Sequence, residues 1–140
     1  MSEIIKKNLS EIIELIKKKE IKSEELAQLY IDEANKSKKL NSFITTCFDN
    51  TIKKAKEFDK KPNTASLLPG IPLAVKDLFC TNGFTTTAGS KMLENFVPNY
   101  ESTVTENLWK EGAILLGKLN CDEYAMGSSN ETSYFGNVIN

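Results

Sequence analysis

A lysine at the end of an apolar run is the first residue whose position suggests chemistry. Residues 70–75 carry no charged side chain, and Lys76 and Asp77 follow them directly. A lysine at the carboxyl end of a buried strand lies where the active sites of α/β proteins form, and burial there favours the neutral amine, which is a base. The same pattern also fits a lysine whose stem reaches the surface and whose ammonium pairs with Asp77. Both interpretations stay open on these residues alone.

The second candidate is a polar loop at residues 127–133, with the sequence Gly-Ser-Ser-Asn-Glu-Thr-Ser. Its hydroxyls, amide and carboxylate can bind a polar substrate, and its backbone N–H groups are further donors. A turn-rich loop that caps the next element has the same composition. Asp122 and Glu123 lie just before the loop. Adjacent residues of an extended chain point to opposite faces, so we expect no catalytic pair of carboxylates here.

The absence of histidine excludes more catalytic mechanisms than any other feature of the composition. Without histidine the chain alone assembles neither a Ser–His–Asp nor a Cys–His pair, and no histidine-based metal site. Any acid or base must therefore be Lys, Asp, Glu, Tyr or Cys. Cys47, Cys80 and Cys121 are odd in number and match no CxxC pattern. We therefore expect buried free thiols, no disulfide framework and no metal site.

Composition and charge indicate an ordinary soluble domain. The 140 residues suit one domain, and 40% hydrophobic with 26% charged residues argues against disorder. No apolar run approaches the roughly 20 residues that span a bilayer, and the N-terminus lacks the apolar segment of a signal peptide. We expect a cytoplasmic protein without membrane contact, an organelle matrix being the alternative. The net charge of −1 gives no sign of direct nucleic-acid binding.

The hydrophobic pattern predicts helices first and an α/β arrangement afterwards. A helix is expected after Ser10, which suits an N-cap position, and a second one from Ser23, where Glu24 and Glu25 follow at the positive end of the helix. A short strand is expected at residues 41–48, with a third helix after it.

Later in the chain, residues 71–76 and 113–116 have the continuous apolar character of buried strands. Between them, residues 102–111 predict a helix with Val104 and Leu108 facing inward. A strand, a helix and a strand in this order favour a parallel crossover.

Three segments, taken in order, resemble the motifs of one enzyme family. Residues 70–77, Gly-Ile-Pro-Leu-Ala-Val-Lys-Asp, are similar to the lysine motif of the amidase-signature enzymes. Residues 86–91, Thr-Thr-Ala-Gly-Ser-Lys, resemble the stretch that follows it in that family, and residues 117–129 resemble the segment that leads into the serine signature. The resemblance is strong from residue 70 to residue 137, and it favours the catalytic interpretation of Lys76.

The resemblance implies amide hydrolysis by a Ser–Ser–Lys mechanism. The family's lysine is neutral in the resting enzyme and deprotonates a bridging serine, which activates a nucleophilic serine. Attack on the amide releases ammonia, and backbone N–H groups of a glycine-rich loop hold the oxyanion. Lys76 corresponds to the family's lysine. Met126 and Ser128 correspond to the loop that lines the acyl pocket.

The implied fold is α/β and incomplete in this chain, with N-terminal helices followed by the first strands and helices of the family's mixed sheet. Residues 1–140 would be the N-terminal part of one domain, with residues 1–60 mainly helical and residues 61–140 carrying the lysine motif. Both catalytic serines are expected soon after Asn140, because Ser128 and Ser129 come too early. We therefore expect an N-terminal fragment that has no amidase activity by itself.

Within the family, Asp-Glu-Tyr-Ala-Met-Gly at residues 122–127 points to the ammonia-supplying subunits of glutamyl-tRNA(Gln) amidotransferases. That resemblance implies glutamine as substrate and a heterotrimer with the B and C subunits of the transamidase. No cofactor is expected in this chain. ATP and Mg are expected with the partner subunit, through which tRNA is mainly contacted. The alternatives are a free-standing amidase of small or fatty amides and a non-catalytic fragment that binds the partner subunits.

Overall fold

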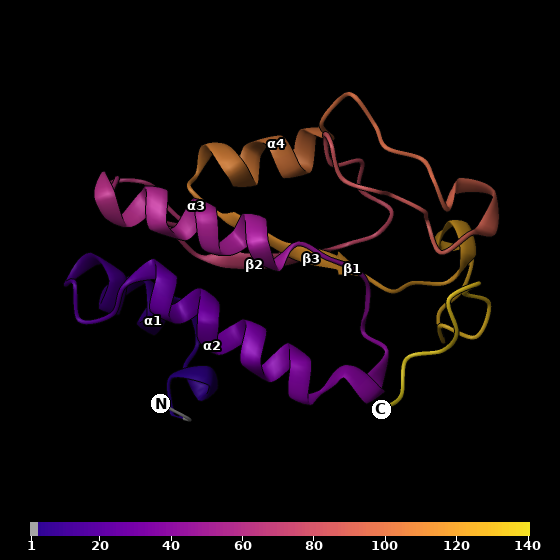
Figure 1. Cartoon of the computed structure of the whole chain (residues 1–140), viewed down its shortest axis with the longest axis horizontal. Coiled ribbons are helices and arrows are strands. Elements are labelled where there is room, and N and C mark those ends of the chain that lie inside the picture. Colours follow the sequence, from indigo (N-terminus) through magenta and orange to yellow (C-terminus); the bar gives the residue numbers. More distant parts are fainter. Residues whose placement is uncertain (1–2) are drawn as a thin grey trace.

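The computed structural model describes residues 3–140 and folds them as helices around a small sheet (Figure 1). The elements in chain order are α1 (Leu9–Lys17), α2 (Ser23–Lys36), β1 (Phe43–Thr46), α3 (Phe48–Lys60), β2 (Pro72–Lys76), α4 (Thr103–Lys110) and β3 (Ile114–Leu119). Met1 and Ser2 lie outside the described residues, and with them the start of the segment for which the sequence predicts no signal peptide. Within residues 3–140 no helix is long and apolar enough to cross a bilayer.

The starts of the first two helices follow from side chains that bind free N–H groups. α1 begins after Asn8, whose side chain accepts from the Glu11 N–H at 3.0 Å, and the Glu11 carboxylate accepts from the Asn8 N–H at 2.8 Å. This reciprocal capping box satisfies two donors of the first turn, so the prediction that Ser10 caps α1 is wrong. α2 begins at Ser23 as predicted. The Asp59 carboxylate of α3 accepts from the Ser23 N–H at 2.9 Å and so joins the two helices.

The three strands form one mixed sheet with β3 in the middle. β2 and β3 run parallel, which confirms the predicted crossover through α4, and β1 pairs antiparallel with the other edge of β3. β3 continues to Leu119, beyond the predicted end at Leu116. Gly117 permits this continuation, because a Cβ there would lie only 2.7 Å from the Thr45 carbonyl oxygen and 2.8 Å from the Phe43 ring.

Helices cover both faces of this sheet. α1 and α2 lie on one side and α4 on the other (Figure 1). α3 lies along β3, where the Thr51 hydroxyl donates to the Leu115 carbonyl at 2.7 Å. The buried cluster on the α1–α2 side consists of Ile12, Ile16, Ile21, Leu26 and Ile71. The cluster on the α4 side consists of Cys47, Val75 and Leu115, packed against Phe84, Leu108 and Trp109.

The inward face of α4 agrees with the prediction in part. Leu108 packs against the buried cluster as predicted. Val104 is 49% exposed, whereas Thr105 is fully buried. The Thr105 hydroxyl contacts the Cys80 carbonyl at 3.3 Å and the Glu101 carboxylate. Thr105 faces inward because these polar groups of the loop after β2 hold it. The start of α4 is therefore tied to that loop.

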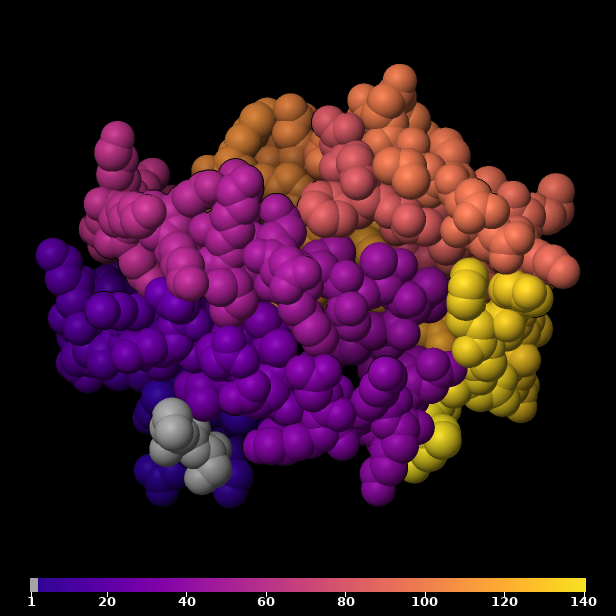
Figure 2. Space-filling view, viewed as in Figure 1, coloured from indigo at the N-terminus to yellow at the C-terminus, as the bar shows by residue number. Residues whose placement is uncertain are grey.

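The last residues of the chain return to its N-terminal half. The Ile139 N–H donates to the Leu40 carbonyl at 2.9 Å, and the Asn41 side chain donates to the Phe135 carbonyl at 2.9 Å. Figure 2 shows this yellow segment lying against the purple chain around residue 40 and below the orange loop that precedes α4. The segment after β3 therefore connects the loop after β2 with the start of β1.

Candidate active site

Lys76 is the last residue of β2, and its side chain is exposed. The burial that the catalytic interpretation expects of Lys76 is therefore not found in this chain. The strand ends at Lys76, and the following residue, Asp77, turns into the core and is fully buried. Within residues 3–140 the Asp77 carboxylate forms its ion pair with Lys118 of β3, not with Lys76. An exposed amine and a buried carboxylate thus stand at consecutive positions of the strand end.

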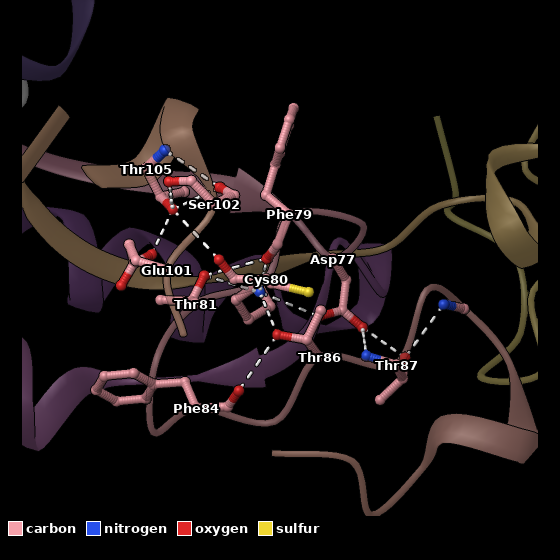
Figure 3. Close-up of polar contacts among 12 residues, drawn as sticks. Asp77, Phe79, Cys80, Thr81, Phe84, Thr86, Thr87, Glu101, Ser102 and Thr105 are labelled. Carbon is pink, nitrogen blue, oxygen red and sulfur yellow. Dashed lines mark hydrogen bonds and ion pairs between the residues drawn. The ribbon is translucent and has the colours of Figure 1, made fainter. Parts of the chain in front are cut away.

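Asp77 is held through its backbone and its carboxylate. Its N–H donates to the Leu119 carbonyl at 2.9 Å, which extends the pairing of β2 with β3, and its own carbonyl accepts from the Ala88 N–H at 2.9 Å. Its Oδ2 accepts from the Thr87 N–H at 2.8 Å and from the Thr87 hydroxyl at 2.5 Å. Figure 3 shows the carboxylate turned toward Thr87. Asp77 therefore fixes the loop at residues 86–90 against the end of β2.

Lys118 is fully buried and donates to three oxygen atoms of the loop after β2. Its Nζ lies 2.6 Å from the Phe79 carbonyl oxygen, 3.0 Å from Thr81 Oγ1 and 2.8 Å from Thr86 Oγ1. The Thr81 hydroxyl itself donates to the Phe79 carbonyl and the Thr86 hydroxyl to the Phe84 carbonyl, both at 3.2 Å. Lys118 must then supply the hydrogen in all three contacts, which requires the ammonium form.

The two buried charges depend on each other. Lys118 Nζ lies 3.6 Å from Asp77 Oδ1, an oxygen that has no hydrogen-bond partner among the described residues. Burial raises the pKa of the Asp77 carboxyl, and the Thr87 and Lys118 donors oppose that rise. Burial lowers the pKa of the Lys118 ammonium, and Asp77 opposes that fall. Loss of either partner would leave an uncompensated charge in the core.

The loop after β3 is organised by two neighbouring carboxylates that face different segments. Asp122 accepts from the Asn130 N–H at 2.8 Å, the Thr132 N–H at 3.1 Å and the Thr132 hydroxyl at 2.9 Å. Glu123 accepts from the Ser90 hydroxyl at 2.5 Å. Asp122 is buried and Glu123 is half-buried. The two carboxylates do not meet, as expected.

Met126 and Ser128 lie in this loop and are exposed. The Tyr124 N–H donates to the Ala88 carbonyl at 2.7 Å, and Ala88 in turn donates to Asp77. Tyr124 and Ala125 both adopt left-handed backbone conformations, with φ of 52° and 58°, which is uncommon for residues other than glycine. A short chain of hydrogen bonds thus connects the strand end that carries Lys76 with the loop that carries Met126 and Ser128. Their role in an acyl pocket stays a prediction.

We expect acid to release the loop at residues 127–132. Hydrogen bonds from the Asn130 and Thr132 N–H groups hold the pKa of Asp122 below its usual range. The carboxylate's contribution to stability is therefore complete above the ordinary aspartate pKa of about 3.9 and is lost as the pH falls through the folded-state value. Hydrogen exchange of the Asn130 and Thr132 amides should accelerate over that window, relative to the Ile114 amide in the sheet. An Asp122→Asn variant should show no such pH step, and a step that persists in it would contradict the assignment.

Metal and disulfide chemistry find no support in the described residues. The chain has no histidine. Within residues 3–140 no group of three Cys, Asp or Glu residues is placed to hold a metal ion. Cys47 and Cys121 are buried free thiols as expected, whereas free Cys80 is half-buried. Burial raises the pKa of the Cys47 thiol to about 11.

Sequence reasoning missed the Asp77–Lys118 pair. A strand that ends at Leu116, as the apolar run predicts, leaves Lys118 in a solvated turn. The signal that could have placed it is the continuation of the apolar pattern to Leu119, interrupted only by Gly117 and Lys118. A lysine inside a buried strand requires a buried carboxylate or several oxygen acceptors nearby.

Comparison with known proteins defines the class of this chain. The family model for Amidase matches residues 25–140. The chain therefore belongs to the amidase family, and the resemblance of its motifs to that family is confirmed.

Within this family the chain is similar to the A subunit of glutamyl-tRNA(Gln) amidotransferase. It is 62% identical over 138 residues to that protein from Pelagibacter ubique, which covers 99% of this chain and 28% of the relative. It is 52% identical over 126 residues to the Zymomonas mobilis protein of the same name, which covers 89% of this chain and 26% of the relative. The chain thus spans little more than a quarter of the length of these curated relatives.

Solved structures share the fold. A bacterial aryl acylamidase of the amidase signature enzymes matches with a TM-score of 0.85 and 26% identity, over 96% of this chain and 29% of that protein. The A subunit of glutamyl-tRNA(Gln) amidotransferase from Thermotoga maritima matches with a TM-score of 0.65 and 30% identity, over 84% of this chain and 24% of that protein. The predicted α/β class and its relation to part of the amidase-signature fold are confirmed.

Proposed function

We propose that this chain carries the catalytic base of a glutamine amidase, the A subunit of a glutamyl-tRNA(Gln) amidotransferase. The amidase would supply ammonia for the conversion of Glu-tRNA(Gln) to Gln-tRNA(Gln). One observation carries the proposal. Lys76 is exposed at the end of β2, beside the buried Asp77–Lys118 pair. The chain that carries it is 62% identical over 138 residues to the A subunit of a glutamyl-tRNA(Gln) amidotransferase.

In the proposed reaction the neutral Lys76 amine takes the proton of a bridging serine, and this serine takes the proton of the nucleophilic serine. The nucleophilic oxygen bonds to the side-chain carbonyl carbon of glutamine, the C–N bond breaks, and the nitrogen takes the proton from Lys76 through the bridging serine and leaves as ammonia. Water then hydrolyses the acyl-enzyme ester, which releases glutamate and the free serine. Both serines would come from the remainder of the amidase domain. Because Lys76 is exposed in this chain, its amine is accessible to them. Met126 and Ser128 would line the acyl pocket.

The proposed assembly is a heterotrimer with the B and C subunits of the transamidase in the cytoplasm. ATP and Mg²⁺ would belong to the partner subunit, since this chain offers no cluster of metal ligands among its described residues. The partner would also make most contacts with tRNA, because a net charge of −1 does not favour binding to a polyanion.

A chimera tests this proposal. Residues 1–140 replace the matching segment of the Pelagibacter ubique protein, 28% of its length, and the product is combined with the B and C subunits. We expect glutamine-dependent ammonia release and amidation of Glu-tRNA(Gln) at rates close to those of the unaltered Pelagibacter protein. An unaltered protein that is active beside an inactive, folded chimera would contradict the proposal.

One observation favours a second candidate, a free-standing amidase. The TM-score to the aryl acylamidase is 0.85 and that to the Thermotoga protein is 0.65, although the sequence identity to the Thermotoga protein is higher, 30% against 26%. The same chimera separates the two functions when it is offered glutamine, an anilide and a fatty amide without the B and C subunits. Hydrolysis of the anilide or the fatty amide in preference to glutamine would support the free-standing amidase.

Residues 1–140 alone are expected to hydrolyse no glutamine. A base without a suitable nucleophile performs no acyl transfer. Ser128 and Ser129 lie on an exposed loop, where the Ser129 hydroxyl donates to the Glu131 carboxylate at 2.8 Å, and a carboxylate is a far weaker base than a neutral amine. The measurement is ammonia release from glutamine by the purified chain, with the chimera as positive control. Ammonia release that disappears in a Lys76→Ala variant of the isolated chain would show that the chain contains its own nucleophile.

A further inference from the structure

Among the described residues, Asp77–Lys118 is the one ion pair whose two side chains are both fully buried, and the proposed reaction does not use it. Both side chains have an exposed fraction of 0%, and their charges lie 3.6 Å apart. Replacing such a pair with apolar residues is often neutral or stabilising, so its presence is no requirement of the fold. Its position directly after the proposed base points to a role in the reaction.

We propose that Asp77 and Lys118 are positioning residues for Lys76, which hold the strand end that carries the amine and keep the net charge beneath it at zero. The inference rests on the proposed function of Lys76. Neither residue touches substrate in this proposal, and both act through Lys76.

The positional part follows from the contacts of the strand end. The backbone of Asp77 bonds to Leu119 on one side and to Ala88 on the other, and its carboxylate bonds to Thr87. The Lys118 ammonium donates to oxygen atoms of Phe79, Thr81 and Thr86. The residue that follows Lys76 is therefore fixed from four directions, which leaves the lysine only its own side-chain torsions.

The electrostatic part follows from the proximity of the pair to Lys76. Lys76 and Asp77 are consecutive residues with Cα atoms about 3.8 Å apart, so the pair lies directly beside the residue that carries the amine. Other titratable groups at this end of the sheet are the buried Cys121 thiol, the half-buried Cys80 thiol and the Asp122 and Glu123 carboxylates. With the pair intact, its two charges nearly cancel at Lys76. Removal of one partner exposes the lysine to the charge of the other.

The pH dependence of kcat/KM tests this inference in the chimera. Its acidic limb reports protonation of the base. In Asp77→Asn the remaining Lys118 ammonium disfavours protonation of Lys76, so the limb should move to lower pH by about one unit. In Lys118→Met the remaining Asp77 carboxylate favours protonation, so the limb should move to higher pH by about as much. The double variant should return the limb to its original position. Two single variants that leave the limb unmoved, or move it in the same direction, would overturn the inference.

A milder variant covers the case in which a charge substitution prevents folding. Thr86→Val removes one acceptor from Lys118 and keeps both charges. We expect kcat to fall several-fold while KM stays unchanged, because a displaced base weakens only the transition state. Thr51→Val is the matched control, since it removes another buried hydroxyl, which bonds to the Cys47 and Leu115 carbonyls. Equal kcat values for the two variants would count against the inference.

Lys76→Ala distinguishes this inference from the proposed function. If that chimera keeps its activity, the role of Lys76 fails and the positioning role fails with it. If Lys76→Ala is inactive and the acidic limb of the kcat/KM profile is unchanged by substitution of Asp77 or Lys118, the proposed function stands and only the positioning role is wrong.

Discussion

Lys76→Ala in the chimera is expected to lower kcat for glutamine hydrolysis about 10³-fold, with KM changed little. General-base catalysis contributes about 10² to 10⁴ in rate, and no histidine in residues 1–140 is available to replace the lysine. The side chain is exposed in this chain, so its removal should change stability by no more than about 0.5 kcal/mol. Steady-state ammonia release and thermal unfolding of the same preparation separate the two effects.

Two controls sharpen this result. Lys60→Ala removes another exposed lysine, in the last turn of α3, and should leave kcat unchanged. Addition of a small primary amine to the Lys76→Ala chimera should restore part of the activity, because a free amine can occupy the vacated position and accept the proton. Activity of Lys76→Ala within threefold of the unaltered chimera would remove Lys76 from the catalytic role.

The strand that presents Lys76 could be predicted from local pattern alone. A continuous apolar run that ends in a lysine indicates a buried strand and its carboxyl end, and β2 ends at that lysine. The parallel partner could be predicted for the same reason, because β3 begins with a run of apolar residues. These elements depend on hydrophobic periodicity, which is a property of adjacent residues.

The exposure of Lys76 and the burial of Lys118 could not be predicted in this way. Which of two lysines enters the core depends on where oxygen acceptors from a distant loop converge. The acceptors of Lys118 come from Phe79, Thr81 and Thr86, at sequence separations of 32 to 39 residues. A pattern among adjacent residues carries no information about such long-range contacts. The error at Val104 has a similar cause, since Thr105 faces inward toward polar groups of the same loop.

The role of Lys76 depends on family membership more than on local chemistry. Residue types alone leave Lys76 open between a base and a surface lysine, and its exposure in this chain agrees with either. Family membership supports the catalytic interpretation. The hydrogen-bonded path from Asp77 through Ala88 to Tyr124 adds that the lysine motif and the loop of Met126 are one connected structure.

Asp77→Asn is expected to destabilise residues 1–140 by about 3–5 kcal/mol, the largest stability effect that this structure predicts. The substitution leaves the Lys118 ammonium fully buried without a counter-charge, and removal of one partner of a buried pair costs about this much. Lys118→Met should be destabilising for the converse reason, because it leaves the Asp77 carboxylate unpaired. Urea unfolding followed by far-UV circular dichroism gives the difference, and the thermal inactivation half-life of the chimera gives an independent measure.

The double variant Asp77→Asn/Lys118→Met decides whether the charges or the packing cause this loss. If unpaired charge dominates, the double variant should be more stable than the sum of the two single losses predicts, by at least about 1 kcal/mol. Thr51→Val, which removes a buried hydroxyl elsewhere beside β3, should combine additively with either single variant. Additive losses at Asp77 and Lys118 would mean that each residue stabilises the fold through its own hydrogen bonds, with no energetic coupling across the 3.6 Å ion pair.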